Sequence, residues 1–228
     1  IKKINPPGLI LCLLFSFFYL KMELNKYRKN MLLRSLLLVF FSLSLSFSLS
    51  AGEPYGPHNT AKWQIWAYSS AAPSFLGDKA TIIGGDGKVI RGGSNGWTCQ
   101  AGNPRSYPEK GWKSAHEAMP ACFDEVGAKW MGAFMKDEKP NLSRSTFMWM
   151  LHGDVGEDNT TPKVLNKADS TPGEWIESGP HLMLLPKDAS DLANYSDDFM
   201  HGEPYVMMPD TVYAHIMIPV ESYYDYQD

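Results

Sequence analysis

The runs GPHLMLLP (residues 179–186) and VYAHIMIPV (residues 212–220) decide how this chain folds. Each holds a His-x-Met tripeptide within a short apolar stretch, and a proline follows closely. Side chains alternate between the two faces of a β-strand, so each run is predicted to be a strand with a His/Met face and an aliphatic face. The His/Met face consists of His181, Met183, His215 and Met217.

A third run, TFMWMLHG (residues 146–153), has the same alternation. Met148, Met150 and His152 occupy one parity, and larger aromatic and aliphatic side chains occupy the other. If the three strands are neighbours, their His and Met side chains share one face of a sheet.

A helix is predicted from about Ala121 to Glu138. Pro120 suits its first turn and Pro140 marks its end. We expect this helix to cover the aliphatic face of the sheet and to leave the His/Met face to loops or a cleft. Its apolar stripe consists of Phe123, Val126, Trp130, Met131, Phe134 and Met135.

Residues 80–99 predict a hairpin around Gly85-Asp86-Gly87, because glycine and aspartate accept the positive φ of a tight turn. Residues 53–77 are aromatic and rich in turn formers, which indicates a covering strand or an extended arm. The fold class that follows is α+β, a mostly antiparallel sheet of about five strands packed against one main amphipathic helix.

The first part of the chain is typical of a leader. Residues 1–30 are interpreted as upstream read-through or a leader extension. Lys26, Arg28, Lys29 and Arg34 precede an apolar run and a small-residue end, as in a secretory signal peptide that starts at Met22 or Met31, and residues 31–52 are predicted to be that signal peptide. A membrane anchor is the alternative, although the run is shorter than the roughly 20 apolar residues of a spanning helix. Residues 53–228 are expected to form a single secreted or periplasmic domain.

Charge excludes two partner classes for that domain. Seven of the 21 basic residues and one of the 25 acidic residues precede residue 53, which leaves 14 basic and 24 acidic side chains. A net charge of about −10 repels nucleic acid and anionic membrane surfaces. We therefore expect no nucleic-acid partner and no stable membrane insertion after leader cleavage.

Cys99 and Cys122 are the cysteines of the expected domain, since Cys12 lies in the leader. An isolated pair in an exported chain predicts a disulfide, here tying the hairpin to the start of the helix. A redox or metal-binding pair usually has a C-x-x-C spacing, which these residues lack.

Four segments together carry a family resemblance: WTC at 97–99, Cys122 at the start of a helix, GPHLM at 179–183 and YAHIM at 213–217. In these segments the chain resembles a group of small secreted bacterial proteins without an assigned function. The resemblance covers residues 80–220. It implies export and one compact domain, and it assigns no catalytic residue.

Imidazole and thioether are ligands that suit copper, especially Cu(I). The sequence therefore predicts a binding domain for a small ligand or soft metal. The first candidate ligands are His181, Met183, His215 and Met217, and the second are His152, Met150 and Met148. Haem or an apolar ligand could use the same residues. The competing interpretation is structural, because methionine fills core gaps and strand histidines often bond main-chain carbonyls.

Three further interpretations stay open. A hydrolase could combine His152, His181 or His215 with Asp154 and Ser178, because triads are defined by geometry and not by order. The acidic loop with Asp154, Glu157, Asp158 and Asn159 offers oxygen ligands for calcium, without the spacing of an EF-hand. An interaction module would use the aromatic side chains of the N-terminal arm, which are Trp63, Trp66, Tyr68 and Phe75.

Overall fold

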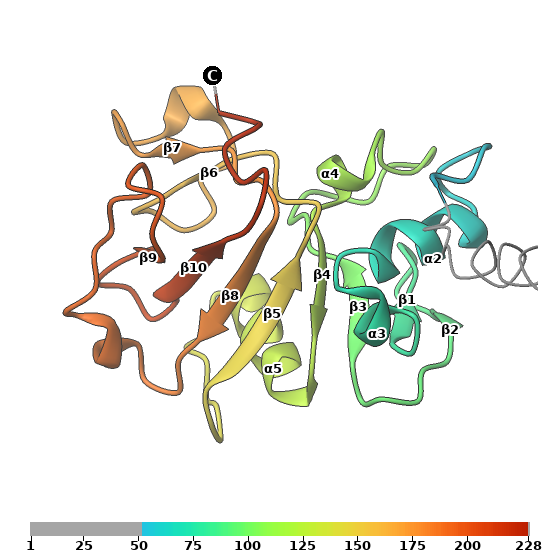
Figure 1. Cartoon of the computed structure of the whole chain (residues 1–228), viewed down its shortest axis with the longest axis horizontal. Coiled ribbons are helices and arrows are strands. Elements are labelled where there is room, and N and C mark those ends of the chain that lie inside the picture. Colours follow the sequence, from blue (N-terminus) through green and yellow to red (C-terminus); the bar gives the residue numbers. More distant parts are fainter. Residues whose placement is uncertain (1–51, 228) are drawn as a thin grey trace, which may run out of the picture. The chain divides into compact units, whose positions relative to one another are not determined.

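The protein is described here by a computed structural model covering residues 52–227 (Figure 1). The expected leader, residues 1–52, lies outside the described residues apart from Gly52. The helices are α2 (Ala61–Ser69), α3 (Ser74–Gly77), α4 (Ala115–Ala118) and α5 (Glu125–Lys136), with 3₁₀ turns η1 (Lys167–Asp169) and η2 (Ala189–Leu192). The strands are β1 (Thr81–Ile83), β2 (Val89–Arg91), β3 (Thr98–Ala101), β4 (Pro120–Phe123), β5 (Thr146–Met150), β6 (Glu157–Asp158), β7 (Trp175–Ile176), β8 (His181–Leu185), β9 (Tyr205–Met207) and β10 (His215–Pro219).

Eight strands form one mixed sheet in the order β2-β1-β3-β4-β5-β8-β10-β9. Among the strands of residues 52–227, only β1 and β3 pair in parallel, and β6 and β7 form a separate two-stranded sheet. The predicted combination of α and β structure is therefore present. The expectation of about five strands and one main amphipathic helix was not confirmed, because the described part of the chain has eight strands in its main sheet and four helices. The four-residue strand β4 is too short for alternation to reveal it.

The disulfide between Cys99 and Cys122 is confirmed, and it joins two strands. The two residues lie directly opposite each other on β3 and β4, with a Cα–Cα distance of 4.1 Å. The expectation that Cys122 opens the helix was wrong, since residues 120–123 pair with β3 and form β4.

Helix α5 begins later than the apolar stripe indicated because Asp124 caps it. The Asp124 carboxylate accepts hydrogen bonds from the amides of Val126 at 2.9 Å and Gly127 at 2.8 Å. Aspartate at this position satisfies amides that have no partner within the helix. Met135, assigned to the stripe, is 45% exposed.

Residues 53–77 form helices α2 and α3, and not the covering strand or arm that was expected. The Thr60 hydroxyl accepts a hydrogen bond from the amide of Trp63 and caps α2. Trp63 and Tyr68 are buried in a core with Cys99 and Cys122, whereas Phe75 is exposed. Most of the aromatic surface that an interaction module would use is therefore inside the protein.

Helix α5 covers the His/Met face of the sheet, which overturns the expected arrangement. Its Trp130 and Phe134 share a core with Met148, Met183 and Met217, while α5 lies beside β4 and β5 (Figure 1). Methionine is apolar and a neutral histidine is readily buried, so polarity did not oblige this face to be open. The opposite face packs against α2 around Trp149 and against η2 around Ile216.

Candidate functional site

The three runs with alternating His and Met lie side by side as β5, β8 and β10. Met183 on β8 is paired with Met217 on β10 and, on its other side, with Met148 on β5. His181 faces Met150 across the β5–β8 ladder, and His215 faces Met207 across the β10–β9 ladder. Two His-x-Met segments thus run in opposite directions with their methionines opposed and their histidines at opposite ends.

A small cavity of about 50 Å³ lies between this face and helix α5. One water needs roughly 10–15 Å³ of such space, so the cavity has room for a few waters or a small ion. Seven of the 12 methionines of the chain line it. The lining residues are Gly102, Met119, Trp130, Met131, Phe134, Met150, Asp154, Glu157, His181, Met183, Met207, Met208, His215 and Met217.

Both cavity histidines are oriented by their own main chain. His181 Nδ1 lies 2.7 Å from the carbonyl oxygen of Gly179, and His215 Nδ1 lies 2.8 Å from that of Tyr213. A carbonyl only accepts hydrogen bonds, so each Nδ1 carries the proton and each Nε2 carries a lone pair. Both Nε2 atoms are buried and have no hydrogen-bond partner in the described protein. Metal-binding histidines are typically oriented in this way.

Burial keeps both imidazoles neutral. It lowers the pKa of His181 to about 4, although the bond to the Gly179 carbonyl acts in the opposite direction. Burial likewise lowers the pKa of His215 to about 4. At neutral pH both Nε2 atoms are therefore able to accept a hydrogen bond or a metal ion without first losing a proton.

The cavity also has a polar end, formed by Asp154 and Glu157. Asp154 Oδ1 accepts hydrogen bonds from the amides of Gly156 at 3.0 Å and Ser178 at 3.4 Å. Burial raises the pKa of both carboxyl groups, and the charge of Asp154 raises that of Glu157 further, while Arg105 lowers it. This end of the cavity can therefore carry either protons or negative charge close to neutral pH.

Asp154 and Glu157 line the cavity, but their neighbours Asp158 and Asn159 do not. Asp158 accepts hydrogen bonds from the amides of Thr160, Thr161 and Thr171, which hold the loop together. No group of three or more His, Cys, Asp or Glu side chains placed to hold a metal ion occurs within residues 52–227. The oxygen-ligand site considered for calcium is therefore not assembled there, and any metal in the cavity depends on thioether ligands.

His152, one of the second candidate ligands, lies away from the cavity. Strand β5 ends at Met150 and the chain turns at Gly153, which has φ = 66°, so the alternation stops before His152. Its Nε2 lies 2.8 Å from the Ser70 hydroxyl, and its carbonyl bonds the His116 ring. Met150 does line the cavity, whereas Met148 is buried beside it.

The serine contacts do not form a hydrolytic triad among the described residues. Ser178 is buried, and its hydroxyl accepts a hydrogen bond from Tyr223 at 3.1 Å. Ser70 does contact His152, but its hydroxyl also donates to the Trp66 carbonyl at 2.7 Å at the C-terminal end of α2. That end of a helix carries partial negative charge and does not stabilise an oxyanion.

Sequence reasoning missed several residues of this site. Trp130, Met131 and Phe134 were interpreted as core packing, and they form both core and cavity wall. Asp154 and Glu157 were considered as calcium ligands and Asp154 as the acid of a hydrolase, but neither was placed beside the His/Met face, and Met207 and Met208 were not among the candidate ligands. Only a strand order could reveal that these residues converge, because they come from distant parts of the chain.

No family model, no curated protein and no solved structure matches this chain. Within residues 52–227, none of the helices has the length and apolar character required to cross a membrane.

Proposed function

We propose that this chain is a secreted or periplasmic binding domain for a soft monovalent cation, foremost Cu(I), held in the cavity between α5 and the sheet. One observation carries the proposal: two opposed His-x-Met segments line a buried cavity, and both imidazole Nε2 atoms lack a protein partner.

Strand geometry puts one histidine and two thioethers within reach of a single ion. His181 and Met183 are two residues apart, about 7 Å along β8, and Met217 is directly across on a strand about 5 Å away. His181 pairs with Pro219, four residues beyond His215, so the two histidines are offset by about 13 Å along the strands. One ion therefore binds Met183, Met217 and one of the two histidines. The two binding modes, with His181 or with His215, use the same two sulfur atoms.

The ligand set favours a monovalent soft ion over a divalent hard one. Thioether and imidazole are neutral and soft, which matches Cu(I) and Ag(I) better than calcium or magnesium. The cost of burying an ion rises steeply with its charge, and neutral ligands do not offset that cost for a dication. Asp154 and Glu157 supply negative charge at one end of the same cavity.

The volume argues against the larger ligands. Cofactor and drug-sized sites usually measure 300–1,000 Å³, against about 50 Å³ here. Haem would require α5 to separate from the sheet. Export is supported by the disulfide, which persists in oxidising compartments, and by the leader-like composition of residues 31–52.

The test is an anaerobic competition of the domain against a chromophoric Cu(I) chelator, with Ag(I) as a redox-stable second probe. We expect one ion per chain. Replacing both Met183 and Met217 by Leu, which conserves side-chain volume, should weaken binding by at least about 100-fold, because both modes lose their sulfur ligands.

Two further variants separate ligation from nonspecific sulfur binding. His181→Ala or His215→Ala alone should weaken binding only a few-fold, because the other histidine remains, and the double variant should abolish tight binding. Replacing the exposed Met135 and Met200 by Leu should change nothing. Absence of binding, or equal affinity for the wild type and the Met183→Leu/Met217→Leu variant, would refute the proposal.

A further inference from the structure

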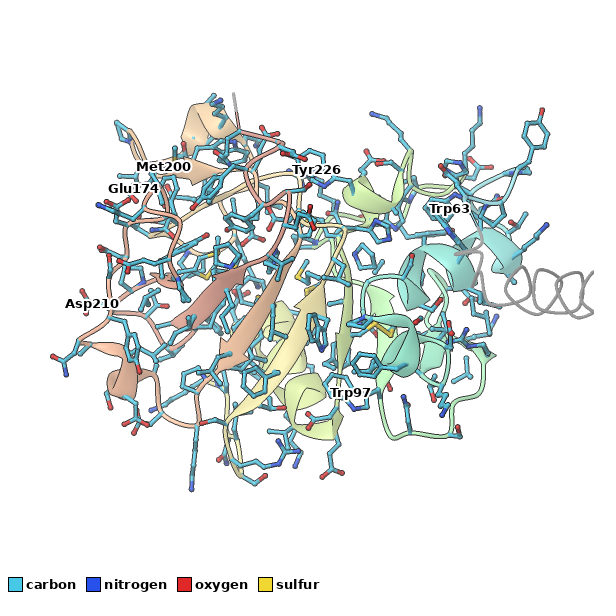
Figure 2. The ribbon with its side chains drawn as sticks, in the orientation of Figure 1. Trp63, Trp97, Glu174, Met200, Asp210 and Tyr226 are labelled. Atoms are coloured by element: carbon cyan, nitrogen blue, oxygen red, sulfur yellow. A yellow bond between two sulfur atoms is a disulfide. The ribbon has the colours of Figure 1, made fainter. Side chains whose placement is uncertain are left out.

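An open groove of about 710 Å³ lies on the outer side of the segment that joins β9 to β10. Its floor includes Val206, Pro209 and Ala214, and its rim includes residues of η2 and of the loop before β5. Figure 2 places Asp210, another lining residue, at the outer edge of the molecule. The groove is lined largely by exposed and half-exposed residues, whereas nearly all the residues that line the His/Met cavity are buried.

The groove and the cavity share a wall that is one side chain thick. Trp130 belongs to the lining of both. The neighbouring chain alternates between them: Val206, Pro209 and Ala214 face the groove, and Met207, Met208 and His215 face the cavity. Since the candidate ligand His215 lies immediately behind this wall, the groove offers an approach to it from solvent.

The wall contains a strained turn and one hydrogen-bonded latch. Met208 and Asp210 adopt positive φ values of 56° and 59°, which are unfavourable for side chains larger than glycine. Trp130 packs edge-to-face against Tyr213 and His215, with ring centroids 6.3 Å and 5.4 Å apart. The Tyr213 hydroxyl donates to the Glu138 carbonyl just beyond the C-terminus of α5, at 3.0 Å, and so ties the β9–β10 segment to that helix.

We propose that the groove is the entry site for the cation of the buried cavity, and that Trp130 is the gating residue, latched by the Tyr213–Glu138 hydrogen bond. The proposal rests on the proposed function for the nature of the ligand, a soft monovalent cation. Opening requires the Tyr213 hydroxyl to leave the Glu138 carbonyl and the β9–β10 segment to move away from Trp130. Strain at Met208 and Asp210 lowers the cost of that movement.

Tyr213→Phe tests the latch without truncating the core, because it removes only a hydroxyl group. Tyr224→Phe is the matched control: its hydroxyl donates to the Phe199 carbonyl at 2.8 Å, and Tyr224 lines neither the groove nor the cavity. The first readout needs no metal. Hydrogen peroxide transfers one oxygen atom to a methionine sulfur and leaves as water, and mass spectrometry follows this for Met208 and Met217 relative to the exposed Met200.

We expect peroxide to oxidise Met208 and Met217 about five- to tenfold faster in Tyr213→Phe than in the wild type or in Tyr224→Phe. This factor corresponds to the free energy of one lost hydrogen bond. The second readout is the rate of Cu(I) uptake and of its release to the chelator. Both rates should rise by a similar factor in Tyr213→Phe while the Kd stays within about twofold, whereas a merely structural role would change the Kd.

The outcomes separate the two proposals. Equal oxidation rates in all three proteins would overturn the gate, whether or not copper binds. Faster oxidation in Tyr213→Phe together with no Cu(I) or Ag(I) binding would keep the route into the cavity and overturn the proposed function. A Tyr213→Phe variant whose release rate rises while its uptake rate stays unchanged, so that the Kd rises, would also overturn the gate.

Discussion

His181 and His215 combine complete burial with a free Nε2, and this affects stability as well as binding. Each ring is neutral because the surrounding side chains exclude water, and each donates its Nδ1 proton to a main-chain carbonyl two residues earlier. In the unfolded chain both side chains have the ordinary histidine pKa of about 6.5. Between pH 4 and pH 6.5 the folded protein therefore binds fewer protons than the unfolded chain.

The first prediction concerns acid stability. Since the folded pKa of each histidine, about 4, lies below the unfolded value, their contribution is complete above about pH 6.5 and is lost as the pH falls toward 4. Each histidine adds a slope of at most about 1.4 kcal/mol per pH unit to the free energy of unfolding. Because the raised pKa values of Asp154 and Glu157 give a slope of opposite sign, the histidine slope is read as the difference between the wild type and histidine variants in urea unfolding from pH 4.5 to pH 7.

His215→Gln should flatten that slope by about one proton, whatever it does to stability at neutral pH. His201→Gln is the control, because His201 is exposed and the Asp198 carboxylate raises its pKa. An unchanged slope in His215→Gln would mean that His215 is not buried as a neutral ring.

At the scale of single elements, α5 is the part whose position the sequence left least certain. Its start is fixed by Asp124, whose carboxylate also accepts the Thr146 hydroxyl at 2.9 Å and pairs with Arg144 at 2.5 Å. The cap therefore joins the helix to the start of β5, the strand that carries Met148 and Met150.

The second prediction is that Asp124→Ala lowers the free energy of unfolding by about 2 kcal/mol, the upper end for an N-cap, because it also removes the acceptor of the Thr146 hydroxyl. Chemical denaturation measures this directly. Asp188→Ala makes the same change at the exposed 3₁₀ turn η2 and should cost less than about 0.5 kcal/mol. Similar losses in both variants would refute the special role of Asp124.

Alternation in β8 and β10 predicted which side chains share a face, because side-chain parity is a property of any strand. It did not predict which face α5 covers. Met183 and Leu185 are both apolar and share a parity, so the His/Met face could be a core as readily as the aliphatic face. His152 was wrongly predicted to share the His/Met face for a different reason. The β5–β8 ladder ends at Met150, where the chain turns and Gly153 approaches the Ser178 carbonyl closely.

On the scale of the whole domain, the main sheet carries two large cores that meet at β4. Ala121 and Phe123 face the core beneath α5, whereas Cys122 faces the core beneath α2. The strand order that creates this arrangement depends on long-range pairing, which no local pattern specifies. The cysteine pair was the exception, because a domain with two cysteines allows a single intramolecular bridge.

The third prediction concerns that bridge. The disulfide joins residues 23 apart in sequence, and in the chain-entropy model a loop of that length stabilises the folded protein by about 3 kcal/mol. The loop includes α4 and residues 102–114, which have no helix or strand of their own, so the unfolded chain gains much freedom without the bond.

A reducing agent should lower the free energy of unfolding by about 3 kcal/mol. Cys99→Ala/Cys122→Ala should be equally destabilised and should not respond to the reducing agent. A free-thiol assay on the natively produced protein provides the decisive check, because two reactive thiols would show that the bridge does not form and would also remove a main support for export.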